Sequence, residues 1–149
     1  VLIEAIKSAG AEGSLLNHSE HPLSFNNIRE TIKRCNKLNI KIICCVASVN
    51  EARKVIPLKP YAIAFEDPKL ISTGKSILEH DSESVKKFFG LFKNSKIIPL
   101  CGAGISTKED FKSALALGCK GVLISSSVML SKNPAEVLKE FVSELQGDK

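Results

Sequence analysis

Residues 96–117 read KIIPLCGAGISTKEDFKSALAL, and this stretch contains the complete structural unit from which the fold is predicted. The apolar run 96–100 predicts a buried strand, and the glycines of 101–104 predict a tight turn after it. Ser106 and Glu109 have the spacing of a capping box, which predicts a helix through the end of the stretch. A strand is therefore followed directly by a glycine turn and a capped helix.

The same unit recurs along the chain. Four further apolar runs end in small or polar residues and cover 13–16, 41–46, 61–65 and 121–124. A segment of helical periodicity follows each of the first three runs. Apolar positions at Ile28, Ile32, Cys35 and Leu38 predict one amphipathic helix, and a capping box at 48–51 predicts the next. Asn133-Pro134 predicts the start of a last helix, and residues 1–9 resemble the end of an earlier one.

Strands that are apolar throughout and alternate with amphipathic helices indicate an α/β fold with a parallel sheet. Five such units fit either a doubly wound sheet or part of a (β/α)8 barrel, and periodicity alone does not separate the two. In both architectures the chemistry lies beyond the carboxyl ends of the strands. His18, Glu66, Gly102, Gly104 and Ser125 all follow predicted strand ends.

Composition limits the class of protein. The 149 residues are 44% hydrophobic and 25% charged, which predicts one globular domain over 1–149 and excludes a disordered or collagen-like chain. The net charge of +5 is scattered, aromatic residues make up 5% and tryptophan is absent, so a nucleic-acid partner is not expected. No apolar run approaches the roughly 18 residues of a membrane span, so we expect no membrane association.

The five cysteines form an odd set without CxxC spacing, and each lies in an apolar run or a helical pattern. This usage predicts reduced, buried thiols and a cytoplasmic protein. Cys44 and Cys45 are adjacent in a predicted strand, so their side chains should point to opposite faces of the sheet.

Two loops are candidates for binding a phosphate group. Glycines at 102 and 104 would let the backbone approach a phosphate, although a tight turn alone could also require them. Serines 125–127 follow the next predicted strand, where they could bind phosphate or simply cap a turn. A barrel often builds its phosphate site from the loops after its last two strands, which favours the binding interpretation.

Glu66 follows an apolar strand directly, a position that raises the pKa of a carboxyl group and suits a general base. Residues 67–75 after it combine a proline, apolar tips and small residues, as a closing lid requires. The alternative is an ordinary surface loop with a salt-bridged glutamate. His18 could polarise a carbonyl as a neutral imidazole, or it could be structural; His18 and His21 lack the further ligands of a zinc site.

Three motifs in this order, 17–20 (NHSE), 66–74 (EDPKLISTG) and 102–106 (GAGIS), resemble triosephosphate isomerase, particularly its short archaeal type. The resemblance implies that His18 polarises the substrate carbonyl, Glu66 moves the proton, and Glu20 is a supporting carboxylate. It also implies that loop 67–74 closes over the enediolate. The implied phosphate ligands are the backbone groups near Ile71, Ser72, Gly102, Gly104, Ser125 and Ser126.

The family implies interconversion of dihydroxyacetone phosphate and glyceraldehyde 3-phosphate, without cofactor or metal, in glycolysis and gluconeogenesis. It also implies a homodimer or homotetramer at full length. The chain would supply about strands 4 to 8 of the (β/α)8 barrel, and we expect three more strand-helix units before Val1 in the full-length protein.

The family's first-strand Asn-x-Lys motif has no match, and its lysine attracts the dianionic substrate. Because that lysine is absent and two parallel edges would stay unpaired, we expect no useful activity from the 149 residues alone. Two alternatives stay open: another phosphate-binding barrel enzyme, or a catalytically silent fragment that acts as a phosphate-binding or assembly module.

Overall fold

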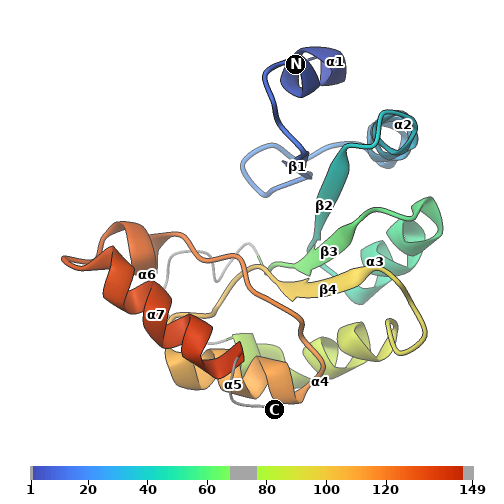
Figure 1. Ribbon diagram of the computed structural model, residues 1–149. Helices are drawn as coiled ribbons and strands as arrows, with labels where there is room; N and C mark the ends of the chain where they lie inside the picture. Colours follow the sequence, from blue (N-terminus) through green and yellow to red (C-terminus); the bar gives the residue numbers. More distant parts are fainter. Residues whose placement is uncertain (1, 68–76, 146–149) are drawn as a thin grey trace.

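The computed structural model describes residues 2–67 and 77–145, with the backbone alone for 77–80 and 145. Its centre is a parallel sheet of four strands in the order β1-β2-β3-β4 (Figure 1). The strands are β1 Gly13–Leu16, β2 Lys41–Val46, β3 Ala62–Phe65 and β4 Ile98–Cys101. The helices are α1 Ile3–Ser8, α2 Phe25–Lys37, α3 Val49–Val55, the 3-10 turn η1 Ile56–Leu58, α4 Ile77–Gly90, α5 Lys108–Ala116, α6 Ser126–Met129 and α7 Pro134–Leu145.

The strand order decides between the two architectures that the sequence left open. In a doubly wound sheet the order reverses at a switch point, whereas in a barrel each strand pairs with the next one along the chain. All three strand pairs here are parallel and sequential. Figure 1 shows α2, α3, α4 and α5 outside the curved row of strands, as in a barrel wall. The fold is therefore part of a (β/α)8 barrel.

The fifth predicted strand, 121–124, is shorter than expected. It forms one isolated parallel bridge, between Cys101 and Val122, and is held to β4 by a few backbone bonds that include Leu123 N–H to the Cys101 carbonyl at 2.9 Å. In the described residues it has a neighbour on one side only. Only Val122 takes part in the bridge, so the predicted strand is reduced to a single paired residue in the described chain.

The helix caps confirm one prediction and correct another. Ser48 Oγ accepts a bond from the Glu51 amide at 3.2 Å and begins α3 as expected. The predicted cap at Ser106 is wrong by one residue, because Thr107 caps α5 and exchanges bonds with Asp110. The Asp110 carboxylate also accepts the Ser106 amide at 3.1 Å, so one side chain satisfies both amide groups and the helix begins later.

Alternation along the strands separates two apolar layers. The inner layer contains Cys45, Ala62, Ala64 and Leu100, whereas Cys44, Ile63 and Phe65 belong to the outer layer beneath the helices. Cys44 and Cys45 thus point to opposite faces, as predicted. Residues 28, 32 and 35 of α2 are buried against the outer layer, which confirms the helical stripe. Within the ranges that the structure describes, no helix has the length and hydropathy of a membrane-spanning segment.

Candidate active site

Side chains alternate between the two faces of the sheet, and this alternation continues past the strand ends. It brings Cys45, Glu66 and Gly102 to the inner face. Ala62, Ala64 and Glu66 share one face of β3, Leu100 and Gly102 share the same face of β4, and Cys45 belongs to the inner face of β2. Backbone bonds hold the exit of β3: Glu66 N–H donates to Val46 O at 2.9 Å, and Gly102 N–H donates to Phe65 O at 2.8 Å. Glu66 therefore projects inward at the carboxyl end of the sheet.

Glu66 is a buried carboxylate. It is 3% exposed and is the one charged residue in the buried core of the described chain. Burial raises the pKa of Glu66, while the neighbouring His18 and a hydrogen bond from the Cys45 thiol act in the opposite direction. A carboxylate held in this way is a stronger base than an exposed one.

His18 lies between two carboxylates in the loop after β1. Its Nε2 is 3.8 Å from Glu66 Oε1, and its Nδ1 is 3.6 Å from Glu20 Oε2. The backbone N–H of Glu20 donates to Nδ1 at 3.4 Å. Because an amide can only donate, Nδ1 accepts, and the neutral ring then carries its proton on Nε2, the nitrogen that faces Glu66.

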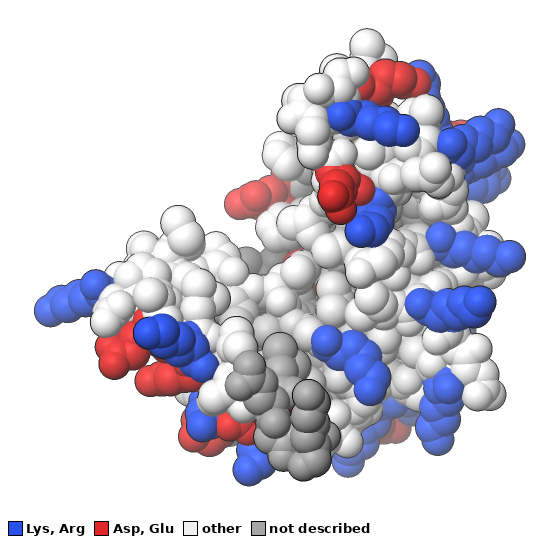
Figure 2. Space-filling model, in the orientation of Figure 1, with Lys and Arg blue, Asp and Glu red and all other residues white. Residues whose placement is uncertain are grey.

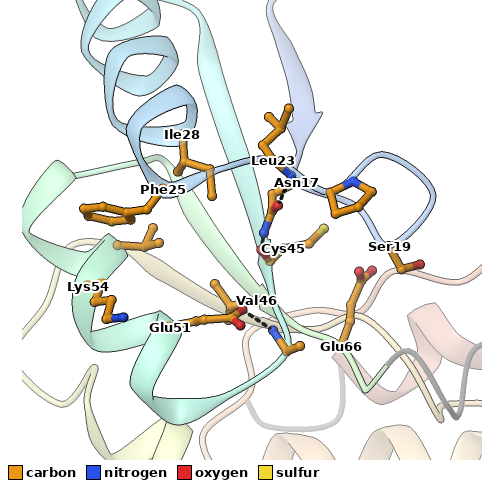
Figure 3. A pocket seen from close by; sticks show the side chains of 13 residues that line it. Asn17, Ser19, Leu23, Phe25, Ile28, Cys45, Val46, Glu51, Lys54 and Glu66 are labelled. Carbon is orange, nitrogen blue, oxygen red and sulfur yellow. Dashed lines mark hydrogen bonds between the residues drawn. The ribbon is translucent and has the colours of Figure 1, made fainter.

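Asn17 orients the loop that carries His18. Its backbone φ is 60°, its side-chain amide donates to the Cys45 carbonyl at 2.9 Å, and its Oδ1 accepts the Leu23 amide at 2.8 Å (Figure 3). The side chain therefore ties the end of β1 to β2 and closes the loop over 18–23. Asparagine tolerates the left-handed region better than most residues, which suits it to this position.

The two glycines of the 102–104 turn have different structural roles. A Cβ on Gly102 would lie 2.8 Å from Glu66 Oε1, so this glycine makes room for the carboxylate. Gly104 has φ 67°, a conformation that glycine adopts without strain. The sequence predicts that both glycines bind phosphate or only form a tight turn, and it gives no sign of the contact between Gly102 and Glu66.

One open cavity of about 760 Å³ brings most of the predicted site together. Its lining includes His18, Glu20, Glu66, Gly102, Gly104, Ser125 and Ser126. Glu20 is largely exposed at its edge, with 79% of its side chain accessible. Ile71 and Ser72, together with the expected lid after Asp67, lie outside the described residues.

Glu66 also borders a second cavity, shown in Figure 3. This cavity has a volume of about 370 Å³ and lies between β2, α2 and α3, with Phe25, Ile28 and Val55 in its lining. Glu51 sits at its edge, where its carboxylate accepts the Ala47 amide at 2.9 Å. The Glu66 side chain thus separates an apolar cavity from the more polar one that holds His18.

Two residues of the site were missed at the level of sequence. Cys45 donates its thiol hydrogen to Glu66, and Asn17 positions the His18 loop. Cys45 could have been found from alternation, because it lies on the inner face of the strand beside Glu66. The Asn17 side chain bonds to Cys45 on another strand and to Leu23 at the end of its own loop, and no spacing along the chain indicates either bond.

Comparisons with known proteins agree with the geometry. The family model described as Triosephosphate isomerase matches residues 1–141. The chain is 40% identical over 144 residues to the triosephosphate isomerase of Methanocaldococcus jannaschii, covering 95% of this chain and 66% of that protein. It is 39% identical over 144 residues to that of Saccharolobus solfataricus, covering 96% of this chain and 63% of the relative. The chain thus spans about two thirds of the length of these relatives.

Solved structures agree on the fold at low sequence identity. The native KDPGal structure superposes with a TM-score of 0.70 at 16% identity, covering 98% of this chain and 66% of that one. The thiamine phosphate pyrophosphorylase from Pyrococcus furiosus gives a TM-score of 0.70 at 17% identity, covering 97% and 64%. The strand order, the inward carboxylate and the family match together lead to one conclusion: the chain belongs to the triosephosphate isomerase family.

Proposed function

We propose that a complete barrel containing this chain interconverts dihydroxyacetone phosphate and D-glyceraldehyde 3-phosphate, with Glu66 as the base and His18 as the electrophile. The observation that carries the proposal is the 3.8 Å separation between His18 Nε2 and Glu66 Oε1 on one cavity. An enolisation needs a base at the carbon and a hydrogen-bond donor at the carbonyl oxygen, and these two atoms supply both.

The reaction balances with these two side chains alone. The Glu66 carboxylate removes a proton from C1 of dihydroxyacetone phosphate while the His18 Nε2–H donates to the carbonyl oxygen, and the C1–H electrons form the enediolate. The hydroxyl proton then moves from the C1 oxygen to the C2 oxygen, and Glu66 returns its proton to C2, which leaves C1 as the aldehyde carbonyl. A proton on Nε2 is the tautomer that the Glu20 amide favours.

The phosphate group of the substrate would bind the backbone amides near Gly104, Ser125 and Ser126. All three line the same cavity as Glu66. Glu20 would support the His18 ring from its outer side through its backbone N–H, which donates to Nδ1 at 3.4 Å. We assign Gly102 to accommodating Glu66 rather than to contacting phosphate, because its Cα faces the carboxylate. The complete barrel is expected to be a homodimer or homotetramer, as in the family.

The test is complementation of the barrel. The 149-residue chain is assayed alone and after refolding with a polypeptide carrying the first three strand-helix units of the Methanocaldococcus jannaschii relative. We expect isomerase activity only in the mixture, and a loss of about 10²- to 10⁴-fold for Glu66→Gln. Glu140→Gln, an exposed change of the same kind on α7, should leave turnover unchanged.

Wild-type turnover in Glu66→Gln would disprove the assignment of the base. A mixture that assembles and binds inorganic phosphate but has no activity would favour the alternative of a silent phosphate-binding module.

A further inference from the structure

Lysines gather at the amino ends of the strands, opposite the site described above. The segments that lead into β2, β3, β4 and the Val122 bridge are 36–41, 56–61, 91–97 and 116–121. They contain six lysines and no aspartate or glutamate: Lys37, Lys41, Lys59, Lys93, Lys96 and Lys120. In Figure 1, β3 and β4 begin on the right, and Figure 2 shows lysine and arginine side chains along that margin.

Part of this basic face is concave. A groove of about 680 Å³ lies between the α4–β4 connection and the segment after α5. Lys86, Lys93, Lys96 and Lys120 all line it, and its lining includes no carboxylate among the residues that the structure describes. Ile98, Ala116 and Leu117 supply accessible apolar surface between the lysines. We call this feature the lysine groove.

The walls of the lysine groove are held by hydrogen bonds. On one side, Ser95 N–H donates to Phe92 O at 3.0 Å, and Ser95 Oγ accepts the Ile97 amide at 3.1 Å. On the other side, Lys120 N–H donates to Pro99 O at 2.9 Å. Because both walls are fixed by the backbone, the lysines extend from a preformed surface, and only their side chains have to be ordered when a ligand binds.

The charges of the groove are not balanced within the described chain. No ion pair joins any of its four lysines to a carboxylate in residues 2–67 and 77–145, whereas Lys41 on the same face pairs with Glu12 at 3.4 Å. Four ammonium groups around one hollow repel one another, and a bound anion would relieve that repulsion. Lysine is a common phosphate ligand, because its ammonium group offers three donors and a compact charge.

We propose that the lysine groove binds a small amphiphilic polyanion of the nucleoside polyphosphate class. The phosphates would contact the lysines, and the apolar ring would lie on Ile98, Ala116 and Leu117. The groove volume is within the range of about 300–1,000 Å³ typical of small-molecule sites. Its concave shape favours a small molecule over a nucleic acid or a membrane, which would need a flatter or longer basic surface.

The lysine groove is separate from the candidate active site. It lies at the beginning of β4, and Gly102 lies just past its end, roughly 15 Å away at the rise of a strand. The inference therefore stands whether or not Glu66 and His18 catalyse isomerisation.

Calorimetric titration of the 149-residue chain with ATP, without divalent cations, tests the proposal. We expect saturable binding that is weakened about tenfold or more in Lys93→Gln/Lys96→Gln. The matched control is Lys33→Gln/Lys112→Gln, which removes the same charge from exposed positions on α2 and α5 and should bind within about twofold of wild type. Inorganic tripolyphosphate should bind more weakly than ATP, because it lacks the apolar ring.

Amide chemical shifts locate the ligand independently of the variants. We expect ATP to move the resonances of 93–97 and 117–120. Shifts confined to 102–106 and 125–127 would place the phosphates in the candidate active site and overturn the proposal. Absence of saturable binding, equal weakening in both double variants, or tripolyphosphate binding as tight as that of ATP would also overturn it.

Discussion

The carboxylate of Glu66 lies directly against the Cα of Gly102, so closely that a Cβ at position 102 would come within 2.8 Å of Glu66 Oε1. The two residues extend adjacent parallel strands on the same inner face. Gly102, which the sequence predicts as a phosphate ligand, is thus needed to accommodate the candidate base.

Replacing Gly102 by alanine should displace the Glu66 side chain, because the new methyl group would overlap both its Cγ and its carboxylate. We expect activity of the complemented barrel to fall about 10²-fold or more, since misplacing a catalytic group by about 1 Å has an effect of that order. Gly90→Ala is the control, because a Cβ there meets nothing within 4 Å. Equal activity in the two variants would contradict the proposed packing.

Glu66→Gln should stabilise the fold at neutral pH. The folded-state pKa of Glu66 is raised by burial, so its favourable contribution to stability is present below the unfolded-state pKa and is lost as pH rises through the folded-state value. Above that value the ionised carboxylate is buried at a cost that glutamine avoids. Thermal melts should show a melting temperature a few degrees higher for Glu66→Gln at pH 7–8, with the difference vanishing in acid.

For this melting experiment the comparison is Glu140→Gln, which changes an exposed glutamate and should not alter the pH dependence. A lower melting temperature for Glu66→Gln at pH 8 would mean that the ionised carboxylate has compensating partners.

Cys45→Ala should raise the pKa of Glu66 further. The Cys45 thiol donates to the Glu66 carboxylate and lowers its pKa, so removing the donor removes that stabilisation of the charged form. Carbon-detected NMR titration of the Glu66 carboxyl group should give a higher midpoint in Cys45→Ala and a midpoint near wild type in Cys45→Ser, which keeps a donor. Cys44→Ala truncates an equally buried thiol on the opposite face and should not move the midpoint. An equal shift in Cys44→Ala would indicate a general loss of packing.

Two substitutions of Asn17 distinguish how much its backbone conformation and its side-chain hydrogen bonds each contribute to stability. Asn17→Gly keeps access to φ 60° but loses the bonds to Cys45 O and Leu23 N, which should cost about 1–3 kcal/mol in the free energy of unfolding. Asn17→Ala loses the bonds and also strains the left-handed backbone, adding about 1–2 kcal/mol. Urea denaturation measures both values, and identical costs for the two variants would show that the backbone conformation of residue 17 is not maintained.

The elements that could be read from the sequence are those defined by uninterrupted local patterns. The bounds of β1 and β2 agree with the apolar runs 13–16 and 41–46, and α7 begins at Pro134 as expected. The run 121–124 has the same apolar character yet forms only one bridge, because a strand also depends on neighbours that the run itself does not contain. The cap of α5 is Thr107 and not Ser106, because the Thr107 hydroxyl accepts the Asp110 amide and the Asp110 carboxylate accepts the amides of both Ser106 and Thr107.

By itself, the sequence determined the alternation of strands and helices, the side chains at the strand ends, and the motifs that mark the family. These depend on periodicity and spacing within a few turns of chain, where the geometry of the backbone is known in advance. Only the tertiary structure decided that the strands follow one another in order, that Cys45, Glu66 and Gly102 form one inner layer, and that His18 faces Glu66 at 3.8 Å. Those relationships arise from pairing between distant segments, where a change of one residue in register would turn each side chain to the opposite face.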